Sequence, residues 1–82
     1  MIVELNNEEF LTWIKDEMKN QNEVSLRYKG FRFVMQPTGK SIEVYSNGKT
    51  MANYSSFDEF LNNFLIKGHF FMDIIEDLDF DG

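Results

Sequence analysis

Residues 24–54 constrain the fold most, because large apolar and polar side chains alternate there with the period-two spacing of β-strands. Two glycine dipeptides divide this segment, Lys29-Gly30 and Asn47-Gly48, and both are typical of tight hairpin turns in which glycine takes a positive φ. A two-residue turn at Lys29-Gly30 fixes the pairing of the strands that it joins. The predicted cross-strand pairs are Tyr28–Phe31, Leu26–Phe33 and Val24–Met35. All six side chains are apolar, so they predict one buried face.

The next two strands are predicted to keep that apolar face. A four-residue connection, Pro37 to Lys40, predicts the pairs Met35–Ile42 and Phe33–Val44. A tight turn at Asn47-Gly48 then places Val44 opposite Met51. We therefore expect four antiparallel strands in a meander, the fourth of them short.

Three amphipathic helices are predicted around these strands. Asn6 followed by Glu9 resembles a capping box that opens a helix from about Asn7 to Asn20. A second helix is expected to begin after Ser55 or Ser56 and to end at Gly68, and a third to run from about His69 to Leu78, because their apolar residues recur every three or four positions. The expected fold class is α+β, with element order α-β-β-β-(β)-α-α. It is a single domain over residues 1–82, a two-layer sandwich in which three helices cover one face of the sheet.

The composition argues against several classes of function. The chain of 82 residues has no cysteine and one histidine, which removes disulfides, thiolate metal sites and cysteine nucleophiles. His69 has no cysteine beside it, and Ser55 and Ser56 are expected to cap a helix rather than to react. We expect no catalytic residue, no metal site and no cofactor. No segment approaches the roughly 20 apolar residues that cross a bilayer, and no signal-like N-terminus is visible, so a cytoplasmic protein is expected.

The segment DLDFDG, Asp77 to Gly82, begins like a calcium-binding loop of the helix–loop–helix type. It has carboxylates at loop positions 1, 3 and 5 and glycine at position 6. The ligands at positions 7, 9 and 12 are missing, so half of the cage is absent. A solvated acidic tail is therefore the expected structure.

Charge is distributed unevenly around the net value of −6. Residues 24–54 carry five basic side chains and one acidic side chain, whereas both flanking segments are acidic. The expected pairing places Arg27, Arg32 and Tyr45 in one row on the water-facing side of the sheet. Such a row has two interpretations, a docking site for a carboxylate, phosphate or acidic partner, or a solvated surface that shields the backbone.

A second candidate surface is acidic and lies on the predicted helices. It comprises Asp58, Glu59, Asp73, Glu76, Asp77, Asp79 and Asp81. Trp13, expected to be half exposed on the first helix, is a separate candidate contact residue. The expected function is a non-enzymatic module that binds a protein partner, of the interaction or inhibitor class, as a monomer or homodimer. Small phage-encoded inhibitors that mimic nucleic acid share this size and acidity, although no motif matches them.

Two alternatives remain open. The α-β-β-β-α order resembles that of double-stranded RNA-binding domains, so the basic sheet face could bind nucleic acid. The segment SSFDEF, however, is acidic where such domains require lysines. The other alternative is a structural subunit of a homo-oligomer.

Overall fold

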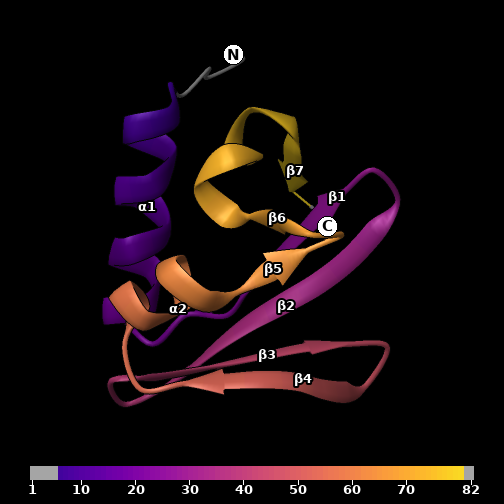
Figure 1. Cartoon of the computed structure of the whole chain (residues 1–82). Helices are drawn as coiled ribbons and strands as arrows, with labels where there is room; N and C mark the ends of the chain where they lie inside the picture. The colour runs from indigo at the N-terminus through magenta and orange to yellow at the C-terminus, as the bar shows by residue number, and fades with distance from the viewer. Residues whose placement is uncertain (1–5, 81–82) are drawn as a thin grey trace.

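The computed structural model describes residues 6–80 as an α+β fold with two α-helices and a five-stranded antiparallel sheet (Figure 1). In chain order the elements are α1 (Asn7–Lys19), β1 (Val24–Tyr28), β2 (Phe31–Thr38), β3 (Ser41–Ser46), β4 (Lys49–Tyr54), α2 (Phe57–Asn63), β5 (Leu65–Ile66), β6 (His69–Phe70), the 3-10 turns η1 (Phe71–Asp73) and η2 (Ile75–Asp77), and β7 (Leu78–Phe80). The strand order is β4-β3-β2-β1-β7, and β5 and β6 form a separate hairpin. The α+β class and the meander are confirmed, and a fifth strand joins the sheet.

The first two strands pair as the sequence predicts. Val24 lies opposite Met35, Leu26 opposite Phe33 and Tyr28 opposite Phe31. The turn residues Lys29 and Gly30 both have positive φ, 46° and 84°, as a tight hairpin turn of the mirror-image type requires. The short turn thus fixes the register of the central strands.

The predicted register between β2 and β3 is wrong by two residues. Met35 lies opposite Val44 and Pro37 opposite Ile42, because β2 continues to Thr38 and the turn is shorter than expected. Pro37 lies beyond the start of β1, whose first residue pairs with Met35, so its missing N–H interrupts no ladder on that side. A shift of two residues keeps every side chain on its face, and the apolar face therefore survives.

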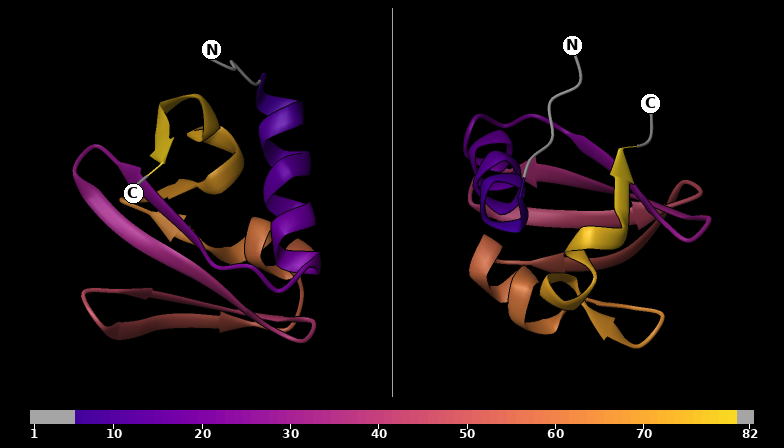
Figure 2. Two further views of the ribbon diagram at one scale, coloured as in Figure 1. Left: turned by 180° about the vertical axis from the view of Figure 1, so that it is seen from behind. Right: turned by 90° about the horizontal axis from the view of Figure 1, so that it is seen from above.

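The pairing between β3 and β4 follows the tight turn as far as Tyr45, but the predicted pair Val44–Met51 is wrong because of a bulge between Val44 and Tyr45. Tyr45 pairs with Thr50 and Val44 pairs with Ala52, which leaves Met51 as an extra residue of β4. Met51 is 46% exposed instead of buried. The left view of Figure 2 shows the twist of this sheet, because β3 and β4 lie across the bottom of the view and β1 and β2 run at a steep angle to them.

The predicted helix from His69 to Leu78 is wrong. Lys67 and Gly68, with φ of 50° and 83°, form the turn of the β5–β6 hairpin, and two 3-10 turns and β7 follow. The second helix accordingly ends at Asn63 and not at Gly68. Strand β7 then adds to the sheet antiparallel to β1, with Leu78 opposite Tyr28 and Phe80 opposite Leu26.

Both helices have the N-caps that the sequence predicts. The Asn6 side chain accepts a hydrogen bond from the Glu9 amide, and the Ser56 side chain accepts one from the Glu59 amide. Helix α1 contacts β1 and β2, whereas α2 contacts β3 and β4. The core joins the apolar sheet face to these helices and to the segment after β6; it comprises Phe10, Ile14, Met18, Val24, Leu26, Tyr28, Phe33, Met35, Ile42, Val44, Phe60, Phe64, Ile66, Phe71, Ile74, Ile75 and Leu78.

Candidate functional site

The predicted basic row is only partly formed. Arg27 and Arg32 lie directly opposite each other and both are exposed, as expected. Tyr45 is not in their row, since it pairs with Val34 and Thr50. Strand β7 adds an acidic neighbour that the sequence analysis did not anticipate, because Asp79 lies opposite Arg27. A carboxylate beside the arginines lowers the positive potential of this face.

Tyr45 is held by a neighbour of its own. Its hydroxyl donates a hydrogen bond of 2.8 Å to Glu23 Oε2. This hydrogen bond raises the pKa of the Tyr45 phenol, and partial burial and the charges of Glu23 and Glu43 act in the same direction. The phenol therefore has a structural role on the outer sheet face.

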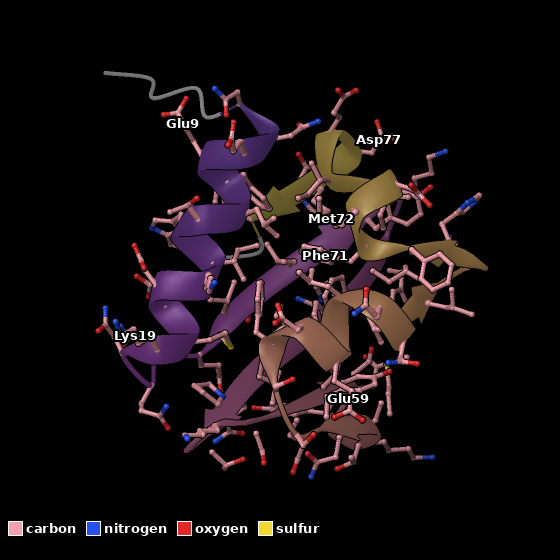
Figure 3. All side chains as sticks on the ribbon, turned by 60° about the vertical axis from the view of Figure 1, so that its left-hand side comes forward. Glu9, Lys19, Glu59, Phe71, Met72 and Asp77 are labelled. Carbon is pink, nitrogen blue, oxygen red and sulfur yellow. The ribbon has the colours of Figure 1, made fainter. Side chains whose placement is uncertain are left out.

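The predicted acidic residues do not form one surface. Glu59 closes the start of α2, where its carboxylate accepts hydrogen bonds from the Ser55 amide, at 2.8 Å, and from the Ser55 hydroxyl. These bonds hold the pKa of Glu59 below its ordinary value. Asp58 is exposed in the same helical turn. In Figure 3, Glu59 lies at the opposite end of the molecule from Glu9 and Asp77.

Asp73 and Glu76 lie on the two 3-10 turns, not on a helix. Glu76 Oε1 accepts a hydrogen bond of 3.1 Å from Asn7 Nδ2, and this contact ties η2 to the start of α1. The exposed carboxylates of η2 thus lie near the acidic first turn of α1, which contains Glu8 and Glu9. The structure therefore gathers acidic residues at the α1–η2 end and separates them from Asp58 and Glu59.

Three aromatic rings lie together beside these carboxylates. Trp13 is partly buried, and its ring meets that of Phe80 edge to face, with centroids 5.1 Å apart. Phe80 also packs against Phe10 at 5.4 Å. Phe80 nevertheless remains 53% exposed, although it extends the apolar sheet face at its edge. An exposed aromatic pair with one well-packed side is the kind of anchor at which binding energy concentrates.

An open groove of about 500 Å³ lies next to Trp13 on α1. We call it the Trp13 groove, and its lining consists of Asn6, Glu8, Glu9, Thr12, Trp13 and Asp16. Three of these residues are carboxylates and none is basic. Thr12 Oγ1 donates to the Glu8 carbonyl at 2.9 Å, so its hydroxyl hydrogen is used within the helix. The groove is an aromatic surface rimmed by negative charge, which suits a cationic side chain.

The described residues contain no cluster of side chains placed to hold a metal ion. Within residues 6–80, no group of three or more histidine or acidic side chains is placed to hold a metal ion. The segment DLDFDG, which resembles the start of a calcium-binding loop, is divided between several elements. Asp77 ends η2 and Asp79 lies in β7, whereas Asp81 and Gly82 lie outside the described residues.

Sequence reasoning identified Trp13 but missed its partners Phe80, Glu8, Glu9 and Asp16. A signal for Phe80 was present, because apolar and acidic residues alternate over 77–80, which is the period of a strand. The likeness of the same letters to a calcium loop obscured that pattern.

Comparison with models of protein families, with characterised proteins and with solved structures finds no significant match. Among the residues that the structure describes, no helix has the length and apolar character needed to cross a membrane. The function therefore has to be argued from the surfaces of the molecule.

Proposed function

We propose that this chain is a non-enzymatic, cytoplasmic interaction module that binds a basic segment of a partner protein in the Trp13 groove. The observation that carries the proposal is that Trp13 lines a groove together with three carboxylates, while its ring packs against the half-exposed Phe80. Lysine and arginine side chains bind favourably over aromatic faces, and nearby carboxylates provide charge-assisted hydrogen bonds. The α1–η2 end supplies further negative potential through Glu76 and Asp77, which would speed association with a basic partner.

An inhibitor is the form of this function that fits the chain best. A small acidic module that occupies a basic site of a larger protein blocks whatever that site normally binds. Mimicry of a nucleic-acid backbone is a more demanding version, because it needs carboxylates in an extended array. Asp58 and Glu59 lie at the other end of the molecule from the α1–η2 carboxylates, and Glu59 is already used as a cap. The proposal therefore rests on the groove.

The experiment uses Trp13 as its own reporter, since the chain has one tryptophan. The probe is the cationic peptide Ac-GRKRG-NH2, titrated into the full chain at low and at high salt. We expect a saturable change in Trp13 fluorescence that weakens with salt. The acidic peptide Ac-GEDEG-NH2 should produce no change.

A matched pair of variants locates the binding. Glu9→Lys and Asp58→Lys change the net charge equally, and both positions lie in the first turn of an exposed helix end. Glu9→Lys should weaken binding by about tenfold, because it puts a cation beside the bound cation. Asp58→Lys should leave affinity within about twofold. Equal weakening by both variants would mean that only the overall charge matters, and the proposed site would be wrong.

Two other outcomes would favour a different binding surface or a different partner. Salt-sensitive binding to generic DNA or RNA, lost on Arg27→Glu with Arg32→Glu, would favour the basic sheet face. Light scattering that shows a stable dimer, disrupted by Trp13→Ala, would mean that the groove is covered by a second copy of the chain.

A further inference from the structure

A second cleft lies at the other end of α1, where it meets two connections of the sheet. It has a volume of about 440 Å³, within the range of small-molecule sites. Its walls are the last turns of α1, the β2–β3 turn and the start of α2, which meet at the lower left of Figure 1. Met18 and Ile42 form part of its floor, and the partly exposed ring of Phe57 forms one side. We call it the lysine cleft.

Three lysines line this cleft and give it a charge opposite to that of the whole chain. Lys15 and Lys19 come from α1 and Lys40 from the β2–β3 turn, whereas Asp16 is the one carboxylate in the lining. Three of the chain's eight basic residues therefore meet here, with a local balance of +2 in a protein of net charge −6. Within residues 6–80, none of the three ammonium groups takes part in a hydrogen bond or ion pair. They remain available to an anion.

A glutamine clamp fixes the two walls that carry these lysines. Gln21 Nε2 donates to the Gly39 carbonyl at 2.7 Å and to the Met18 carbonyl at 3.1 Å. The Gly39 amide donates to Gln21 Oε1 at 2.8 Å. Gln21 itself has a φ of 63°, which lies in the left-handed region. This conformation is unfavourable for any residue that has a side chain. The α1 end and the β2–β3 turn are therefore held at a set separation before any ligand arrives, which reduces the ordering cost of binding.

We propose that the lysine cleft binds a small anionic amphiphile, with its carboxylate or phosphate head among Lys15, Lys19 and Lys40 and its apolar body against Phe57. The head group follows from the three unpaired ammonium groups, and the apolar body follows from the volume and the floor. An inorganic anion alone would leave the apolar floor exposed, and a neutral hydrocarbon would leave the lysines unused. This site differs from the Trp13 groove in the charge of its ligand, although Asp16 belongs to both linings.

The test titrates the ¹⁵N-labelled full chain with decanoate and follows the backbone amide resonances. Decanol and decyltrimethylammonium have the same tail without the anion, and inorganic phosphate has an anion without the tail. Decanoate should shift the amides of the cleft, at Lys19, Gln21, Lys40 and Phe57, in a saturable manner, and each of the other compounds should bind at least about tenfold more weakly.

Variants separate the cleft from general surface charge. Lys40→Glu should weaken decanoate binding by about tenfold, whereas Lys49→Glu, an equal charge change at the β3–β4 turn, should leave it within about twofold. Both positions are exposed, and thermal unfolding would verify that both variants fold. The proposal is wrong if decanol or phosphate binds as well as decanoate, if the shifts scatter over the surface, or if the two variants act alike. Decyl phosphate in a parallel titration then decides which head group the cleft prefers.

Discussion

Phe70 and Phe71 are adjacent in sequence, yet the structure gives them very different energetic roles. Phe71 is fully buried and packs against Phe60 with ring centroids 5.2 Å apart, whereas Phe70 is 45% exposed on the β5–β6 hairpin. Phe71→Ala leaves a cavity in the core and should lower the free energy of unfolding by about 3 to 5 kcal/mol. Phe70→Ala removes a ring that is only about half buried and should lower the free energy of unfolding by roughly 0.75 to 1.5 kcal/mol, half of the transfer free energy of a buried phenylalanine.

Urea unfolding followed by Trp13 fluorescence measures this difference. A domain of this size has an m-value of about 1 kcal/mol/M, so the midpoints of the two variants should differ by about 1.5 to 4 M. If Phe71→Ala fails to fold, Phe71→Leu is a milder substitution. Its destabilisation should still exceed that of Phe70→Ala if position 71 lies in the core. A helix over 69–78 would bury both rings on one side, and equal destabilisation by the two alanine variants would refute the hairpin and the 3-10 turns.

Three further predictions concern polar contacts. Gln21→Ala should lower the free energy of unfolding by about 1 kcal/mol and speed hydrogen exchange of the Gly39 amide, which loses its acceptor. Unchanged exchange at Gly39 would show that the clamp does not form. The pKa of Glu59 is lowered in the folded protein, so its stabilising contribution is present above the ordinary glutamate pKa and is lost as pH falls through the folded value. Glu59→Gln should therefore flatten the acid limb of the stability profile in urea unfolding, and an unaltered limb would contradict this assignment. Glu23→Ala should lower the raised pKa of Tyr45 in an alkaline NMR titration of its ring, because the hydrogen bond to Glu23 is the main cause of the shift; a constant midpoint would rule that cause out.

The parts of the fold that local signals determine were predictable. The Lys29-Gly30 turn sets the β1–β2 register, and cap residues mark the start of both helices. The bulge at Val44 and Tyr45 was not predictable, because it inserts a residue without changing the local pattern of side chains. That single insertion moves Met51 out of the core and turns Tyr54 toward Phe60.

The C-terminal third shows how one pattern can support two backbones. Phe71, Ile74, Ile75 and Leu78 are all buried, as their spacing predicts, but successive 3-10 turns satisfy that spacing as well as an α-helix does. The dipeptide Lys67-Gly68 forms the same kind of turn as Lys29-Gly30, so it joins two short strands where the sequence predicts the end of a helix. The contact between Trp13 and Phe80 depends on this segment, since Phe80 lies in β7 and β7 pairs with β1. Long-range pairing of this kind lies beyond what periodicity can indicate.

The most direct test of the proposed function is to map the bound cationic peptide Ac-GRKRG-NH2 on the full chain by amide chemical shifts. Binding in the Trp13 groove predicts that the perturbed residues cluster at Glu8, Glu9, Trp13 and Asp16, and that Phe80, which contacts Trp13, responds with them. Trp13→Ala should abolish the response, while Phe70→Ala should preserve it. A map centred on Asp58 and Glu59, or a response that survives Trp13→Ala, would contradict it.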